Sequence, residues 1–208
     1  MAINFDNLNP SAPQPTEATP TAGVTLNLEK NMVLDLSKAA PDIRNATLGA
    51  GWDVSQMGSD ADLDIFSILL DENGKISAVG DVIFYNNRSL NGLTLSGDNR
   101  TGAGEGDDEQ IFIDLGSVPD RIKRIVTGVS IFDAVARRQT FGMIDNAYIR
   151  LVNKDTDQEL ARFNLNGDYS TDTTVIFAEL VRSGNDWAFH TIGEGKQADL
   201  NTIIGLYQ

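Results

Sequence analysis

The sequence predicts an all-β fold, an antiparallel β-sandwich of about ten strands in two sheets, with long acidic loops and little helix. Three observations lead to this prediction. Apolar and polar residues alternate with a period of two in many short stretches. Turn-forming residues, such as the pair Asn73-Gly74, separate these stretches. Helical periodicity is scarce along the whole chain.

The expected elements follow one another in short units. The stretches 24–28 and 32–36 resemble each other and are joined by LEKN, which predicts a hairpin. In DENGK, at 71–75, Asn73 and Gly74 are expected to supply the positive φ values of a hairpin turn. One helical turn is expected at 118–123 and a short helix at 199–206, with Asp199 as its N-cap. The expected strands are 24–28, 32–36, 46–52, 62–70, 81–86, 110–115, 124–132, 147–153, 160–165, 174–182 and 186–192.

Composition narrows the class of protein. The chain has 208 residues, a net charge of −14 and a pI of about 4.3, which argues against nucleic-acid binding because phosphates would be repelled. It has no cysteine, which excludes disulfides, thiolate metal sites and cysteine nucleophiles. We expect no signal peptide and no transmembrane segment, and therefore a cytoplasmic protein.

The first 22 residues differ in composition from the rest of the chain. They contain four of the six prolines, mixed with Ser, Thr, Ala and Gln. Such a segment cannot bury enough apolar surface to offset its ordering entropy. We expect a disordered leader over 1–22 and one sandwich domain over 23–208.

The segment GDNRTGAGEGDDE, at 97–109, concentrates negative charge on a flexible loop. Five of its thirteen residues are acidic and four are glycine. Two unit charges ~5 Å apart repel by roughly 3 kcal/mol at an effective dielectric of 20. A divalent cation is the natural counter-charge, and ligands made only of oxygen favour Ca²⁺ over Mg²⁺ and Zn²⁺. The spacing of the acids is not that of an EF-hand.

A second acidic cluster supports this interpretation. Asp60, Asp62 and Asp64 recur at every second position, so on a strand their side chains share one face. Asn86 and Asn87 lie at the end of the next long strand and add amide groups. The alternative is a solvated acidic surface, which acidic proteins also have.

These residues carry a resemblance to the TerD family of tellurite-resistance and stress-response proteins. The segments that match the family pattern are GWD (51–53), DADLD (60–64), FYNN (84–87), GDNRTGAGEGDDE (97–109), VP (118–119), SIFDA (130–134), RRQTFG (137–142), NAYIRLVN (146–153), ELARFNL (159–165) and AELVR (178–182). The match runs in order from about Val24 to His190.

The resemblance implies a β-sandwich whose acidic loops are metal-binding and hold two Ca²⁺ ions. It also implies a role in resistance to tellurite and other stresses, with other stress-response proteins as partners, in a complex at the inner face of the membrane. The metal ligands carried over from the family pattern are Asp60, Asp62, Asp64, Asn86, Asp98, Asn99, Asp107, Asp108 and Glu109, with backbone carbonyls near Gly102 and Gly104.

Catalysis is the least favoured class of function. The chain has one histidine, His190, on an expected strand, and no cysteine, so a nucleophilic triad is not available. The acids are crowded into chelating groups, unlike the two separated carboxylates of a glycosidase. We therefore expect no enzyme. The other alternative is a structural interaction protein in which calcium is only a stabilising staple and the N-terminal leader binds the partner.

Overall fold

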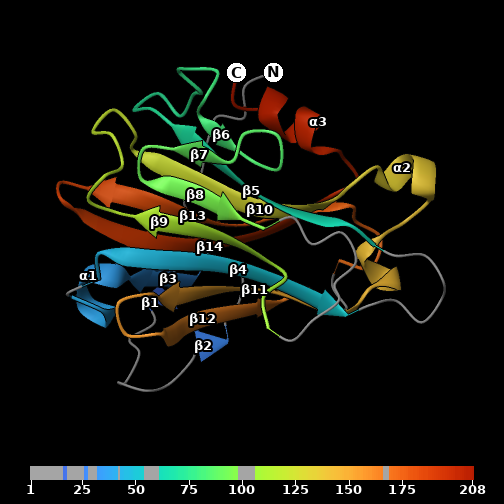
Figure 1. Cartoon of the computed structure of the whole chain (residues 1–208), viewed down its shortest axis with the longest axis horizontal. Helices are drawn as coiled ribbons and strands as arrows, with labels where there is room; N and C mark the ends of the chain where they lie inside the picture. Colours follow the sequence, from blue (N-terminus) through green and yellow to red (C-terminus); the bar gives the residue numbers. More distant parts are fainter. Residues whose placement is uncertain are drawn as a thin grey trace.

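Two seven-stranded sheets pack face to face and form a sandwich (Figure 1). The structure is a computed structural model that describes residues 16–17, 26–27, 32–41, 43–53, 61–97, 106–165 and 169–208. The expected antiparallel β-sandwich is therefore confirmed. Two edge pairs, β1 with β3 and β2 with β12, are parallel, and the other neighbouring strands are antiparallel.

The first sheet has the order β1-β3-β14-β13-β10-β5-β6. Its strands are β1 (Thr16–Glu17), β3 (Met32–Asp35), β14 (Asp186–Lys196), β13 (Thr174–Ser183), β10 (Arg124–Ile131), β5 (Leu63–Leu70) and β6 (Val82–Ile83). The second sheet has the order β2-β12-β11-β4-β9-β8-β7. Its strands are β2 (Leu26–Asn27), β12 (Gln158–Asn164), β11 (Asp145–Asn153), β4 (Asn45–Asp53), β9 (Glu109–Asp114), β8 (Leu93–Ser96) and β7 (Ser89–Leu90).

The core lies between the sheets and is made by the apolar half of each alternating strand. Leu48 and Ile149 from the second sheet pack in the same buried cluster as Ile65, Val129 and Phe177 from the first. Side chains at alternate positions share a face of a strand, so the period-two pattern of the sequence becomes one buried and one outward row.

Strand β5 is buried along its whole length. All eight of its residues are buried because the helix α3 (Leu200–Gly205) covers the outer face of this sheet. Phe66, Ile68 and Val126 pack there in one cluster with Ile203 and Tyr207 from the C-terminal segment. The helix begins as expected at Asp199, whose carboxylate accepts a hydrogen bond from the Thr202 N–H at 2.8 Å.

The expected hairpin of 24–28 with 32–36 is wrong. The described part of the first stretch, Leu26–Asn27, pairs with β12 in one sheet, whereas Met32–Asp35 pairs with β14 in the other. Four residues are long enough to span the ~10 Å between packed sheets. Two stretches with similar patterns therefore lie in opposite sheets instead of pairing with each other.

The connection after Asn86 contains the hairpin β7–β8, with Gly92 at φ 88° in its turn. Two local expectations need correction. In the turn 71–75 only Gly74 has a positive φ, because the Asp71 carboxylate organises the turn through the N–H groups of Asn73 and Lys75. Residues 118–123 form a turn closed by the Ile122 N–H and the Pro119 carbonyl, not a helix.

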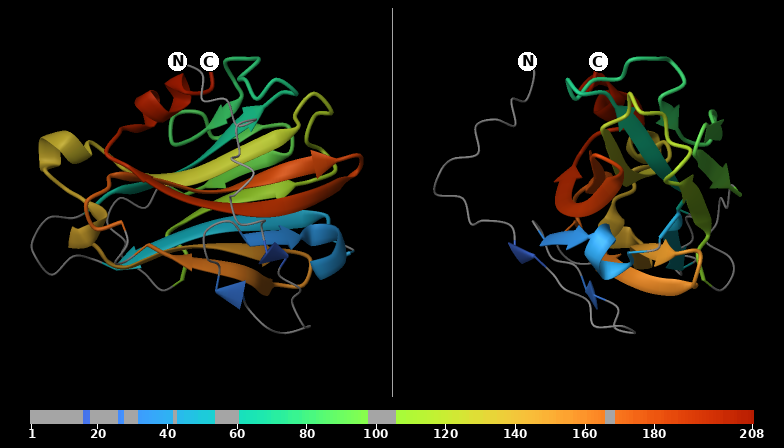
Figure 2. Two further views of the ribbon diagram at one scale, coloured as in Figure 1. Left: turned by 180° about the vertical axis from the view of Figure 1, so that it is seen from behind. Right: turned by 90° about the vertical axis from the view of Figure 1, so that its left-hand side faces the viewer.

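Three short helical segments were not expected from the sequence. They are α1 (Leu36–Ala39), α2 (Ala134–Arg137) and the 3₁₀ segment η1 (Phe141–Met143). Figure 1 shows α1 and α2 at opposite ends of the sandwich, and Figure 2 gives the same arrangement from behind and from the side. Among the described residues, no helix has the length and apolar character required to cross a membrane.

Candidate metal centre

Four strand ends bring acidic residues to one end of the sandwich, the end that carries α2 (Figure 1). In the second sheet, β4 ends at Asp53 and its neighbour β9 begins at Glu109, with Ala50 opposite Glu109. In the first sheet, β5 begins at Leu63, opposite Ile131 at the end of β10. Asp62 directly precedes β5, and Asp64 is its second residue. We call this region the acidic end.

Glu109 connects the two sheets at the acidic end. Its side chain is buried, with the residue 1% exposed, although it is formally charged. The Oε2 atom accepts a hydrogen bond from the Ile65 N–H at 2.9 Å, so a carboxylate of β9 reaches the backbone of β5. A carboxylate in this position is expensive to desolvate and favours a nearby positive charge.

Asp62 and Asp64 are the next buried acids, each 5% exposed. Both lie close enough to Tyr85 to act on its hydroxyl. Burial raises the pKa of Tyr85, and the negative charges of Asp64 and Asp62 raise it further. Arg137, at the end of α2, places Nη2 3.9 Å from the Asp62 Oδ2 atom.

Asp108 is half-buried beside the end of β4. Its Oδ2 atom accepts a hydrogen bond from the Trp52 N–H at 2.9 Å, and the Trp52 indole N–H donates to the Ala61 carbonyl at 3.1 Å. Burial raises the pKa of the Asp108 carboxyl and outweighs the opposing hydrogen bond from Trp52, and the charges of Asp107 and Asp53 raise this pKa further. Through Trp52, the segments before β9 and before β5 are held together.

Asp107 points away from this cluster. Both of its oxygens bind Arg150, with Nε at 2.7 Å and Nη2 at 3.0 Å, and its side chain is only 1% exposed. The Tyr148 hydroxyl at 3.0 Å and the Gln110 amide at 2.9 Å complete its shell. The carboxylate lies over Gly49, where a Cβ would stand 2.1 Å from Oδ2.

This outer network extends along the second sheet. Burial, the charge of Asp107 and the hydrogen bond to it raise the pKa of Tyr148 to about 12. The Arg162 guanidinium stacks 4.0 Å from the Tyr148 ring centre, and Glu159 accepts hydrogen bonds from both Arg150 and Arg162. Gly49 alternates with the core residues Leu48 and Ala50, so this network occupies the face opposite the core.

Asn86 is exposed in the turn that follows β6, next to Tyr85. Its neighbour Asn87 has a structural role, because its amide donates to the carbonyls of Gly80 and Val82. The remaining expected ligands, Asp60, Asp98, Asn99, Gly102 and Gly104, lie outside the described residues. Within the described ranges, no three acidic or histidine side chains form a group that could hold a metal ion.

The donor chemistry at the acidic end nevertheless fits a hard cation. The described acidic side chains at this end are Asp62, Asp64, Asp108 and Glu109, and they offer only carboxylate oxygens. Such donors suit Ca²⁺ or Mg²⁺. Both segments that contain the other expected ligands, 54–60 and 98–105, adjoin these acids in the sequence.

Sequence reasoning missed the residues that organise the acidic end. Tyr85 and Arg137 approach Asp62 from separate segments, and Arg150 removes Asp107 from the cluster. The alternation in AYIRLVN does indicate that Tyr148 and Arg150 share the face opposite Ile149 and Leu151. It gives no information about which acid lies opposite them, since the strand register is not encoded locally.

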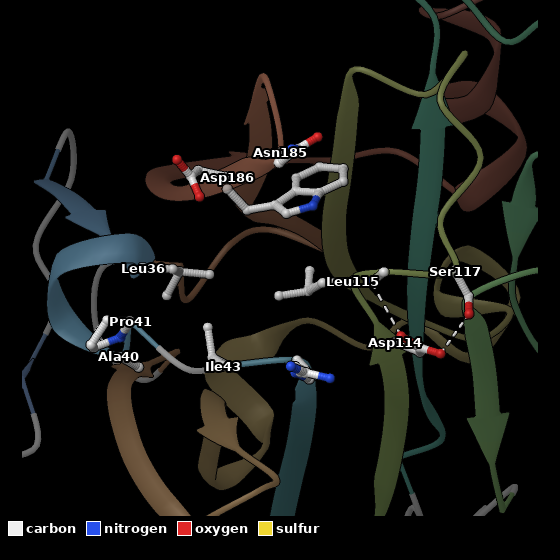
Figure 3. Close-up of a pocket in the computed structure, with 12 residues that line it drawn as sticks. Leu36, Ala40, Pro41, Ile43, Asp114, Leu115, Ser117, Asn185 and Asp186 are labelled. Carbon is white, nitrogen blue, oxygen red and sulfur yellow. Dashed lines mark hydrogen bonds between the residues drawn. The ribbon is translucent and has the colours of Figure 1, made fainter.

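A pocket of about 430 Å³ lies at the other end of the sandwich (Figure 3). Its interior is apolar, with Leu36, Ile43 and Leu115 facing one another, and Trp187 also lines it. Asp114 on its rim accepts hydrogen bonds from the Gly116 N–H and the Ser117 hydroxyl. These contacts fix the loop after β9, and the pocket has the lining expected where two packed sheets end.

A family model for the TerD domain matches residues 24–207. The chain is 44% identical over 187 residues to a tellurium resistance protein TerD of Serratia marcescens, covering 88% of this chain and 97% of that protein. It is 43% identical over 188 residues to general stress protein 16U of Bacillus subtilis, with coverage of 88% and 97%. The chain belongs to the TerD domain family.

Solved structures agree with the fold. The crystal structure of SAV2460, a protein of unknown function, superposes with a TM-score of 0.68 at 28% identity, covering 78% of this chain and 95% of that one. A homologue of the telluride resistance protein from Streptomyces coelicolor superposes equally well over the same shares at 21% identity, which supports the fold alone.

Proposed function

We propose that this chain is a calcium-binding, non-catalytic module that acts in tellurite resistance and the general stress response. Relatives at 43–44% identity carry the names tellurium resistance protein and general stress protein. In this proposal the protein works in the cytoplasm, at the inner face of the membrane, as a member of an assembly with other stress-response proteins.

The observation that carries the proposal is the presence of buried carboxylates from both sheets at one end of the sandwich. Glu109 of β9 accepts a hydrogen bond from the N–H of Ile65, the residue that follows Asp64 in β5, and Asp62 and Asp64 are each 5% exposed. Buried carboxylates of this kind need a positive charge. A cation bound among them would neutralise both sheets at once and hold the acidic end together.

Ca²⁺ is the cation that fits best. It accepts six to eight oxygen ligands in flexible geometry, which suits carboxylates supplied by separate segments. We assign Asp62, Asp64, Asp108 and Glu109 as ligands, together with Asp60, Asp98 and Asn99 and carbonyls near Gly102 and Gly104. Asn86 stays a candidate ligand because it follows Tyr85, which lies near Asp62 and Asp64. Asp107 leaves the ligand set, since Arg150 holds both of its oxygens.

The role we propose is binding, not catalysis. The acids at this end are shared between two sheets, and the single histidine, His190, lies on β14 and faces Glu179 of β13. A bound ion would instead order the acidic loops and complete a surface for a protein partner.

Calorimetric titration of the full chain with Ca²⁺ tests the proposal. The wild type should bind, and Asp64→Asn and Glu109→Gln should each weaken binding about tenfold or more, because each removes a charged ligand. Asp157→Asn is the matched control. It removes the same charge from an exposed turn between β11 and β12, at a position with φ 55° that asparagine tolerates.

Two results would overturn it. One is the absence of Ca²⁺ binding by the wild type. The other is equal weakening by Asp157→Asn and Asp64→Asn, which would indicate diffuse attraction by the net charge of −14 and no defined site.

A further inference from the structure

Arg137 places a positive charge inside the region where the proposed cation would bind. It is the last residue of α2, which follows β10 at the acidic end. Its Nη2 atom lies 3.9 Å from Asp62 Oδ2, and the two side chains are 34% and 7% exposed. Arg137 therefore offsets the charge of a largely buried carboxylate from a partly exposed position.

The contact between Arg137 and Asp62 is long enough for a bound cation to replace it. At 3.9 Å it exceeds the 2.7–3.2 Å range of an N–H···O hydrogen bond, so the guanidinium acts on Asp62 mainly through its charge. A Ca²⁺ ion binds carboxylate oxygens at 2.3–2.6 Å. Ca²⁺ would therefore approach Asp62 more closely than Arg137 does, and the two positive charges would repel each other.

The Arg137 guanidinium is also attracted to an aromatic ring, and this contact does not depend on Asp62. Its guanidinium carbon lies 5.3 Å from the centre of the Phe132 ring. The Phe132 ring is held edge to face by Tyr85 at 5.6 Å, and Tyr85 packs in the same way on Phe84 at 5.1 Å. A side chain repelled from Asp62 can stay over this aromatic row through a cation–π contact.

The backbone of α2 need not move for such an exchange. Residues with φ 54°, Asp133 and Arg138, bound the helix on both sides. Ala134 is buried beneath it, whereas Val135 is 84% exposed on its outer side. A change of rotamer at Arg137 is sufficient.

We infer that Arg137 is an internal counter-ion of Asp62 which a divalent cation must displace, and that Arg137 thereby sets the affinity of the site. This inference rests on the proposed function. Before the cation arrives, Arg137 compensates the charge of Asp62. Afterwards the cation does so, and Arg137 only opposes it.

The test compares three variants of the full chain by Ca²⁺ calorimetry. Arg137→Gln should bind Ca²⁺ about three- to fivefold more tightly than the wild type, the range set by a partly exposed ion pair. Arg137→Lys should bind like the wild type because it keeps the charge. Arg138→Gln is the matched control, since it removes the same charge from the next, exposed residue. The advantage of Arg137→Gln should shrink as salt is added.

Thermal melts give a second readout, because the effect of Arg137→Gln on the melting temperature should reverse between chelator and Ca²⁺. In excess chelator, Arg137→Gln should melt below the wild type because Asp62 loses a counter-charge. In saturating Ca²⁺ it should melt at or above the wild type. Arg138→Gln should show no such reversal.

Several outcomes would overturn the inference. Unchanged or weaker Ca²⁺ binding by Arg137→Gln would do so while leaving the proposed function intact. Equal tightening by Arg137→Gln and Arg138→Gln would show a general field effect instead of a specific counter-ion. If the wild type itself binds no Ca²⁺, the proposed function fails, and this inference fails with it.

Discussion

Asp107 is the best place to perturb the fold without touching the proposed cation ligands. Asp107→Asn keeps the shape of the side chain but removes its charge. The buried carboxylate now makes two hydrogen bonds to Arg150 and one each to Tyr148 and Gln110. An asparagine amide would face the guanidinium donors with donors of its own.

The expected loss of stability follows from these contacts. Removing one partner of a buried ion pair costs about 3–5 kcal/mol. The Arg150 side chain is 26% exposed and remains 2.8 Å from Glu159. Water and Glu159 would therefore still compensate part of the Arg150 charge in the variant. We therefore expect the free energy of unfolding to fall by about 2–3 kcal/mol.

Urea denaturation in excess chelator measures this loss. Arg150→Met and the double variant complete a double-mutant cycle, in which the coupling energy should exceed about 1 kcal/mol. Gly49→Ala gives an independent check, because its Cβ would displace the Asp107 carboxylate and should cost a similar amount. A loss below about 0.5 kcal/mol for Asp107→Asn, with no coupling to Arg150, would refute the reasoning.

Three further predictions concern other parts of the fold. Asp199→Ala should lower the free energy of unfolding by about 1 kcal/mol in chemical denaturation, because it removes the N-cap of α3. Burial lowers the pKa of His190 below 6.5 and outweighs the attraction of Glu179, so Glu179→Gln should lower that pKa further in an NMR titration of this single histidine. Burial alone would raise the pKa of Asp81, but Arg121 holds it below 3.8. The Asp81–Arg121 pair therefore contributes fully to the free energy of unfolding above that value, and its contribution is lost as the pH falls through the lower folded pKa. In acid denaturation, Arg121→Gln should be less stable than the wild type by a constant amount above about pH 4, and the difference should vanish below it.

Much of the fold could be predicted from local patterns. Alternation in stretches such as QIFIDL and AYIRLVN located the strands β9 and β11, because the pleat sends successive side chains to opposite faces. The Asp199 cap located the start of α3. Strand partners could not be predicted in the same way, since Leu26–Asn27 and Met32–Asp35 carry nearly identical patterns and entered different sheets.

The same difference between local patterns and long-range pairing applies to the candidate site. Short-range spacing correctly put Asp62 and Asp64 at the start of one strand. It could not separate Asp107 from Glu109, although they are two residues apart and point to opposite sides of the second sheet. The reason is local: Gly106 has φ 93° and β9 begins only at Glu109, so strand alternation does not extend back to Asp107.

Arg137 illustrates a limit of a different kind. Its four-residue helix is too short to produce a periodic signal, and the Asp62 that it approaches is 75 positions earlier in the chain. Only the pairing of β10 with β5 brings the two segments together. The charge relationships at the acidic end therefore depend on sheet topology more than on any motif.

The central claim is that the acidic end binds calcium and couples the two sheets. The most direct test is the thermal melt of the full chain in excess chelator, then with Ca²⁺, then with Mg²⁺ at the same ionic strength. We expect Ca²⁺ at about 100 times its Kd to raise the Tm by about 5–10 °C, with little effect of Mg²⁺. An unchanged Tm with both ions, or an equal rise with each, would contradict a calcium site at the acidic end.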